Sequence, residues 1–221
     1  MEGPGDFYTE AQRAMQRAQG REALADTVFH AIVADAIGPE HQPVIESRDF
    51  FFLSTVDGTG MPTVSYKGGA PGLVKVDGPN RLSFPHFDGN GMFKSMGNAA
   101  ETGKMGVLFI DFETPNRIRV QGTGRVTDAP ETLARWPGAK LAVELDVESV
   151  FLNCARYIHK HARLEASPYV PDAKGEQPHP AWKRIDAVQP ALTETERART
   201  AEAGGVIDQD GYLDRLMRGV S

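Results

Sequence analysis

The sequence predicts a mainly β protein with flanking helices, in the α+β class. Short strand-like runs separated by glycine-rich turns fill residues 49–127, and both ends of the chain carry helical patterns. The regular strand–helix alternation of a parallel α/β sheet is absent. Many short strands with such turns favour a barrel or a sandwich. We expect three regions: an N-terminal helical extension (1–48), a β domain (49–153), and an irregular and helical C-terminal extension (154–221) that packs on the barrel or on a dimer partner.

Two helices are predicted in the N-terminal extension. Thr9 can cap a helix that begins at Glu10, and Gly20 ends it. A second, alanine-rich helix is expected over residues 22–37, because its apolar residues recur at helical spacing and Gly38-Pro39 follows.

The β domain opens with two apolar runs, 50–56 and 62–67, joined by the hairpin signal Asp57-Gly58-Thr59-Gly60. A helix is expected over residues 92–100, with Asn90 as its N-cap. The remaining predicted strands are 73–76, 81–85, 105–112, 117–126 and 139–147, the last continued or bent by 149–154. The C-terminal extension should be irregular through residue 192, with short helices at 194–203 and 209–217.

Composition excludes several classes of function. The net charge of −6 argues against non-specific nucleic-acid binding, which needs a basic surface. A single cysteine, Cys154, allows no intrachain disulfide. No apolar run approaches the roughly 20 residues of a membrane helix, and the acidic start lacks a signal-peptide layout. We therefore expect a cytoplasmic protein with no membrane and no nucleic-acid partner.

Familiar catalytic motifs are absent. No dinucleotide fingerprint, phosphate-loop lysine motif or nucleophile elbow occurs. His159 and His161 have no cysteine or carboxylate to complete a metal set, so no metal site is predicted. Cys154 is interpreted as a small buried hydrophobe. His86 is of more interest, because it follows a strand end and precedes a Gly-Asn loop. We identify no catalytic residue.

One set of residues suggests a pocket for an anion inside this acidic protein. Ser65-Tyr66-Lys67 ends a predicted strand, and Gly89-Asn90-Gly91 opens a helix that carries Lys94 and Ser95. Arg117 and Arg119 lie on a later strand. A flavin phosphate needs such hydroxyl, cationic and backbone N–H donors, preferably at a helix N-terminus.

The same block resembles the pyridoxamine 5′-phosphate oxidase-related family. The opening hairpin is Phe51-Phe52-Leu53-Ser54-Thr55-Val56-Asp57-Gly58-Thr59-Gly60-Met61-Pro62. Val64-Ser65-Tyr66-Lys67 resembles the strand along the flavin, and Leu82-Ser83-Phe84-Pro85 with Gly89-Asn90 and Ser95-Met96-Gly97-Asn98 resembles the phosphate loop and helix. Gly106 to Asp111 and Arg117 to Gly124 resemble the two strands that follow. The ends of the chain resemble an uncharacterised branch of the family rather than the oxidase proper.

The resemblance implies a split β-barrel with Greek-key-like topology that binds FMN and works as a homodimer, with the flavin at the interface and a small-molecule substrate. The residues it places at the cofactor are Val64, Ser65, Tyr66, Lys67, Phe84, Pro85, Asn90, Gly91, Lys94, Ser95, Arg117 and Arg119. Asn153, Tyr157 and Trp182 are candidates to reach the site from the second chain.

The sequence departs from the family at one phosphate contact. Relatives often carry an arginine shortly after the Gly-Asn pair, where this chain has Met92, and Lys94 is a candidate replacement. The substrate-binding Trp and Arg arrangement of the oxidase is not recognisable, so pyridoxamine phosphate is not assigned as substrate. The leading hypothesis is an FMN-dependent oxidoreductase. The alternatives are a non-catalytic flavin-binding or redox-sensing module, or a split barrel that binds a deazaflavin or haem.

Overall fold

The computed structural model describes residues 3–219 and divides the chain into two units. The first comprises the residues up to Glu165 together with Ala173–Gly175, and the second comprises Ala166–Asp172 and the residues from Glu176 onward. In the described part of the chain, none of the helices combines the length and hydropathy of a membrane-spanning segment.

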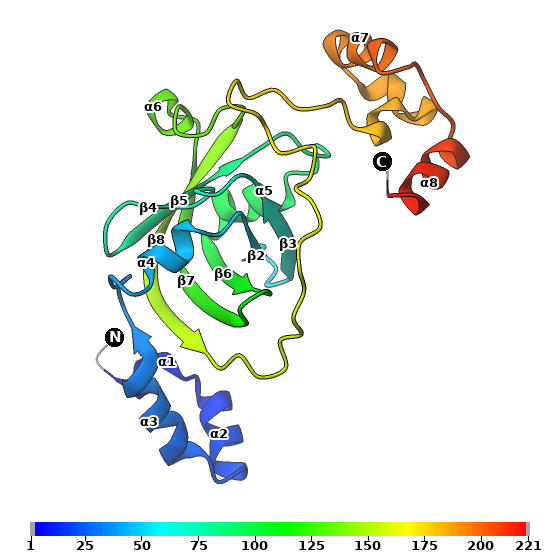
Figure 1. Ribbon diagram of the computed structural model, residues 1–221. Helices are drawn as coiled ribbons and strands as arrows, with labels where there is room; N and C mark the ends of the chain where they lie inside the picture. The colour runs from blue at the N-terminus through cyan, green and yellow to red at the C-terminus, as the bar shows by residue number, and fades with distance from the viewer. Residues whose placement is uncertain (1–2, 220–221) are drawn as a thin grey trace. The chain divides into compact units, whose positions relative to one another are not determined.

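An eight-stranded antiparallel sheet forms the first unit (Figure 1). Its order is β3-β2-β6-β7-β8-β5-β4, and β1 pairs with β8 off this path. The sheet curls without closing, because β3 and β4, at its two ends, do not pair with each other. The fold class is therefore the predicted one: a mainly antiparallel, open barrel with flanking helices. The strands are β1 (Val33–Ala34), β2 (Phe50–Val56), β3 (Pro62–Gly68), β4 (Lys75–Val76), β5 (Arg81–His86), β6 (Lys104–Asp111), β7 (Asn116–Thr127) and β8 (Leu141–Asn153).

Alternating side chains from these strands fill the inside of the sheet. The fully buried core includes Phe51, Phe84, Phe109, Ile118 and Val120. Helix α5 (Lys94–Glu101) adds Met96 and Ala99 to the same core. It follows β5 and leads to β6, which lies three places away from β5 in the sheet. Two short helices, α4 (Gln42–Glu46) and α6 (Pro130–Leu133), occupy connections.

Strand β8 is one continuous strand, where the sequence suggested a strand with a bent continuation. A bulge opposite Gln121 and Gly122 absorbs an extra residue of β8, so the pairing with β7 continues across it. Gly122 allows this close approach, because a Cβ there would lie 2.0 Å from the carbonyl oxygen of Asp146.

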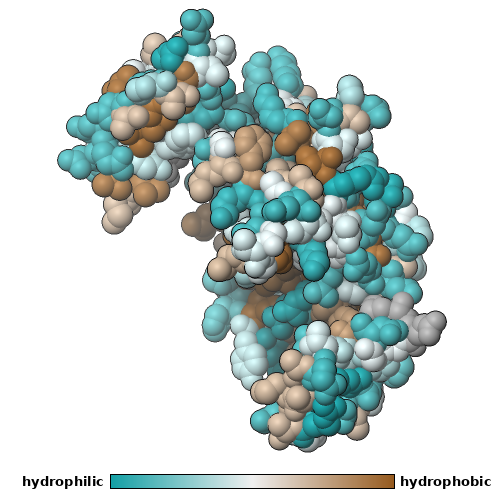
Figure 2. Space-filling view, turned by 180° about the vertical axis from the view of Figure 1, so that it is seen from behind, coloured by the Kyte–Doolittle hydropathy of each residue, from teal (hydrophilic) through white to brown (hydrophobic). Residues whose placement is uncertain are grey.

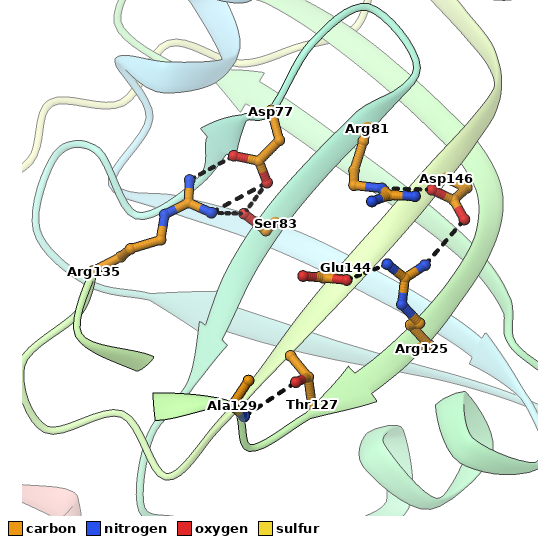
Figure 3. A network of polar contacts seen from close by, with 9 residues as sticks. All are labelled: Asp77, Arg81, Ser83, Arg125, Thr127, Ala129, Arg135, Glu144 and Asp146. Carbon is orange, nitrogen blue, oxygen red and sulfur yellow. Dashed lines mark hydrogen bonds and ion pairs between the residues drawn. The ribbon is translucent and has the colours of Figure 1, made fainter. Parts of the chain in front are cut away.

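Charged side chains on β5, β7 and β8 pair with one another (Figure 3). Arg81 Nε lies 2.7 Å from Asp146 Oδ1, and Arg125 contacts both Glu144 and Asp146. Arg135, on the connection before β8, donates to Asp77 at 2.6 Å and to Ser83 at 2.9 Å. Each arginine in this network therefore has a carboxylate partner.

The N-terminal helices are α1 (Pro4–Phe7), α2 (Glu10–Ala18) and α3 (Glu22–Ile32). Thr9 caps α2 with a reciprocal capping box, which confirms the predicted start. The second helix was predicted too long: it ends at Ile32, because Val33 and Ala34 pair with Phe151 and Val150 of β8. The Phe7 ring packs on Phe151 at 5.7 Å, which holds these helices to the sheet.

The second unit contains two 3₁₀ helices, η1 (Ala181–Arg184) and η2 (Asp186–Ala191), followed by α7 (Glu194–Glu202) and α8 (Gln209–Met217). Both α-helices match the predicted ones closely. Lys183 is buried and its Nζ lies 2.9 Å from Glu196 Oε1. Hydrophobic surface is visible on this unit as brown patches in Figure 2, and Val206, Leu213, Leu216 and Met217 are among its exposed apolar residues.

Candidate functional site

Strand β3 presents two different faces. Ser65 and Lys67 pair with Leu53 and Phe51, whose side chains are fully buried, so these two polar residues face the inside of the sheet. Tyr66 points outward with Val64, and their exposed fractions are 61% and 66%. The tyrosine ring stacks on Phe50 of β2 at 5.4 Å. Only half of the predicted flavin strand therefore faces the inside of the sheet.

Helix α5 begins immediately beside this inner face. Its N-cap is Phe93, whose left-handed φ of 49° is uncommon for a residue other than glycine. The predicted cap, Asn90, is wrong: it lies too far before the helix, and its Oδ1 instead accepts from Met92 N at 3.1 Å within the loop. Gly91 in the same loop has a φ of 75°.

The N-terminus of α5 carries free donors. No side chain caps it, and Gly97 N donates back to the Phe93 carbonyl at 2.7 Å. Within residues 3–219, the backbone N–H groups of Lys94, Ser95 and Met96 have no acceptor. These groups, with the helix dipole, favour an anion at this position.

Three elements meet at this helix end. Ser65 Oγ of β3 and Ser95 Oγ of α5 lie 3.1 Å apart. His86, the last residue of β5, packs its ring against Phe93 at 5.5 Å. The charge of Lys67, which faces the inside of the sheet, contributes to lowering the pKa of His86. Two hydroxyls therefore meet at the start of α5, and the His86 imidazole packs against its N-cap residue.

Lys67 has no counter-ion among the described residues. Burial lowers the pKa of Lys67, and among the described residues no carboxylate forms an ion pair with it. Burial, followed by the Lys67 charge, lowers the pKa of His86 from its ordinary 6.5. An anion at the site would stabilise both protonated groups.

Helix α5 is fixed by its own buried contacts. Asn98 Nδ2 donates to Thr55 Oγ1 at 3.1 Å, and both side chains are buried. Thr102 Oγ1 donates to the Val56 carbonyl at 2.6 Å. These bonds hold α5 against β2, so the position of its N-terminus relative to β3 is set before any ligand binds.

The other predicted cofactor residues of this region differ in burial. Phe84 is fully buried and packs on Phe51 at 5.0 Å, and Pro85 is also buried. Asn90 and Gly91 lie in the exposed loop before α5. Lys94 is exposed, and its charge acts on Asp57, whose pKa is lowered chiefly by the hydrogen bond from Thr59.

Arg117 and Arg119 are not brought together with Ser65, Lys67 and Ser95. Ile118 and Val120 fill the core, so the two arginines between and beside them point to the outer face of β7. Arg119 donates to Asn153 Oδ1 of β8 on that outer face.

Three residues were expected to reach the site from a second chain, and they lie in different environments: Asn153, Tyr157 and Trp182. Asn153 accepts the hydrogen bond from Arg119. Tyr157 is 92% exposed. Trp182 belongs to the second unit, where the Lys183 ammonium lies 5.5 Å from its ring centroid.

Phe93 is the site residue that sequence reasoning missed. It is 52% exposed and provides the aromatic surface beside His86. No propensity rule places a phenylalanine in a left-handed N-cap, so no signal in the sequence pointed to it. His86 was noticed for its place at a strand end but was not assigned to the cofactor.

No arrangement of three or more His, Cys, Asp or Glu side chains within residues 3–219 suits a metal ion. Cys154 was interpreted as a buried hydrophobe, and this is wrong: the thiol is exposed, because it follows the last residue of β8, where the sheet ends.

The fold is an open, mainly antiparallel barrel with flanking helices, which is the architecture of a split barrel. A sequence-family model described as pyridoxamine 5′-phosphate oxidase matches residues 37–154, which is more than half of the chain. The chain therefore belongs to the pyridoxamine 5′-phosphate oxidase family.

Solved structures with a similar fold are distant in sequence. HupZ of Group A Streptococcus is 18% identical, with 57% of this chain and 99% of that chain covered and a TM-score of 0.44. A candidate pyridoxamine 5′-phosphate oxidase of Lactobacillus delbrueckii is 23% identical, with 53% and 95% covered and a TM-score of 0.45. An FMN-binding protein of Syntrophomonas wolfei is 14% identical, with 63% and 97% covered and a TM-score of 0.41. No curated protein matches the chain.

Proposed function

We propose that the chain binds FMN, with the flavin phosphate at the N-terminus of α5, and acts as an oxidoreductase on a small molecule. The observation that carries this proposal is the cluster of donors contributed by β3, β5 and α5. Ser65 and Ser95 supply hydroxyls, α5 supplies free N–H groups, and Lys67 supplies a cation without a counter-ion. Membership in the family supports FMN as the anion.

Each residue of the cluster has a definite part in this proposal. The two hydroxyls and the N–H groups of α5 donate to phosphate oxygens. Lys67 offsets the phosphate charge and recovers part of the cost of its own burial. Phe93 and His86 border the site with aromatic surface. The flavin, when bound, would supply two-electron redox chemistry that none of these side chains provides.

We also propose a homodimer with the flavin at its interface. This rests on the family and on the outer face of β2 and β3, where Val64 and Tyr66 remain exposed and Tyr66 stacks on Phe50. Sedimentation of the flavin-loaded protein should give a dimer at micromolar concentration. A flavin-loaded monomer would contradict this part of the proposal.

The decisive experiment compares FMN with riboflavin, which lacks the phosphate. The purified protein should be yellow, or should take up added FMN, and mass spectrometry should identify the released ligand. Because several charge-assisted hydrogen bonds reach the phosphate, FMN should bind about 100-fold or more tightly than riboflavin. Equal affinities, or a colourless protein that takes up neither flavin, would refute the proposal.

The same preparation separates the alternatives. A deazaflavin or haem has its own absorbance spectrum, which the native ligand would display. Steady-state assays with a panel of electron donors and acceptors test turnover. Bound FMN that no donor reduces would favour a redox-sensing or carrier module over an oxidoreductase.

A further inference from the structure

The second unit has more large apolar side chains on its surface than in its interior. Among its described residues, the buried apolar side chains are those of Ala181, Ile185 and Leu192. Its exposed large apolar residues are Val206, Leu213, Leu216 and Met217 (Figure 2). Domains of about 60 residues or fewer are marginally stable, because they bury a modest share of their surface. We therefore expect this apolar surface to be covered in the native assembly.

Helix α8 carries most of this surface on one side. Tyr212 and Arg215 lie on the other side and are half-buried in the unit, and Ile207, directly before the helix, forms a parallel bridge with Ile185. The apolar residues that point outward are spaced three and four apart, on one helix face: Leu213, Leu216 and Met217. The helix is therefore attached to its own unit by one side and leaves the apolar side to solvent.

The charges of α8 make this side complementary to a copy of itself. Asp208 and Asp210 lie at the start of the helix, and Arg215 and Arg218 lie at its end. Two such helices packed antiparallel bring the acidic start of each against the basic end of the other, with opposed helix dipoles. In the part of the chain that the structure describes, Asp210 forms no ion pair, and Arg218 pairs with Asp214 of its own helix at 3.3 Å.

We propose that α8 is an interaction surface for a second copy of this chain, whose own α8 packs against it antiparallel, with Leu213 near the twofold axis. The occupant is a second copy because a face that is apolar at its centre and oppositely charged at its ends fits itself after a twofold rotation. A pair of helices this short buries less than the roughly 1,200 Å² of a stable interface. It therefore adds to the homodimer contact proposed for the first unit, and in this respect it rests on that proposal.

A single thiol on α8 tests the contact in the full chain. In the Cys154→Ser background, Leu213→Cys places the only thiol of each chain near the proposed twofold axis. Mild oxidation at micromolar concentration should join two chains by a disulfide at least about tenfold faster than in Cys154→Ser/Glu202→Cys, whose thiol lies at an exposed position of α7. Cross-linking no faster than in this control overturns the proposal, including the case in which the first unit covers α8.

Charge reversal tests the antiparallel direction. Adding Asp210→Lys to the Leu213→Cys protein puts cations at both ends of α8, so cross-linking should slow by about two- to fivefold. Adding Arg218→Asp as well makes the two ends opposite in charge again and should restore the rate. A rate that Asp210→Lys leaves unchanged, or that the second change does not restore, overturns the antiparallel contact.

Sedimentation and FMN titration separate this inference from the proposed function. The α8 variants should keep the FMN affinity of the unaltered protein, because none of the changed residues belongs to the cluster at α5. A dimer in sedimentation that does not cross-link through position 213 overturns the α8 contact alone. A monomer that does not cross-link overturns the homodimer as well.

Discussion

Replacing Lys67 with methionine should weaken FMN binding and at the same time leave the ligand-free protein as stable as before or more so. Methionine has a similar length and is also unbranched, so it can follow the same path along β3. The change removes a partly buried ammonium group that has no carboxylate partner among residues 3–219.

The two effects have different magnitudes. A charge-assisted contact with phosphate is worth about 1.5–3 kcal/mol, so its loss should raise the Kd for FMN by about 10- to 150-fold. Removing the unpaired cation and burying an apolar side chain instead should raise the free energy of unfolding of the ligand-free protein by about 1 kcal/mol. Replacing a lysine with a purely structural role would give neither the gain in the free energy of unfolding nor the selective loss of FMN affinity.

Fluorescence titration with FMN and with riboflavin measures the first effect, and urea unfolding of the ligand-free protein measures the second. Riboflavin affinity should hardly change, because that ligand has no phosphate for Lys67 to contact. Lys104→Met, at an exposed position on β6, is the matched control and should change neither flavin affinity. The reasoning fails if Lys67→Met destabilises the ligand-free protein and leaves FMN affinity intact.

Three further outcomes are expected. Because burial and Lys67 lower the pKa of His86, the unfolded chain binds the extra proton more readily, so stability should fall as pH falls below about 6.5, and His86→Gln should make this slope shallower in urea titrations, the remainder coming from His179, whose pKa burial also lowers. The pKa of Glu196 is lowered from 4.5 to about 2, chiefly by the hydrogen bond from Lys183, so the stabilising contribution of Glu196 should be lost as pH falls from 4.5 to about 2. Amide exchange in α7 should report this loss of stability, and Glu196→Gln should abolish its dependence on pH. Gly122→Ala should lower the urea midpoint, at a cost of about 3 kcal/mol or more, because the new methyl group meets the Asp146 carbonyl; an unchanged midpoint would refute the close approach.

Local signals in the sequence were enough to predict most of the elements. The reciprocal cap at Thr9, the turn at Asp57–Gly60 and the alternation along β7 act over a few residues, and each predicted feature is present. Helix α3 was predicted too long because its last turn competes with pairing to β8. That competition depends on a strand more than a hundred residues later, which local pattern cannot indicate.

The sequence indicated candidate site residues, but it could not indicate which face of its strand each residue lies on. Ser65 and Ser95 meet at the start of α5, and Lys67 shares the inner face of β3 with Ser65. Local alternation would have placed the apolar residues of β3, Val64 and Tyr66, inward, yet both are exposed. The face of a strand is decided by its neighbours: the register with β2 and the position of α5 turn the polar residues inward. Neither the register with β2 nor the position of α5 can be predicted from residues that are close together in the sequence.

An inward-facing lysine on β3 has a second physical explanation that must be separated from the binding one. Strand β3 pairs only with β2 in the described sheet, so its other edge is open to pairing with another chain. Natural edge strands are often protected by inward-pointing charges, and Lys67 would serve that purpose without any ligand. Edge protection, however, requires only a charge and does not depend on Ser95, the free N–H groups of α5 or the phosphate. A loss of FMN affinity in Lys67→Met with riboflavin affinity preserved therefore supports binding, whereas new self-association with both affinities preserved would assign the lysine to edge protection.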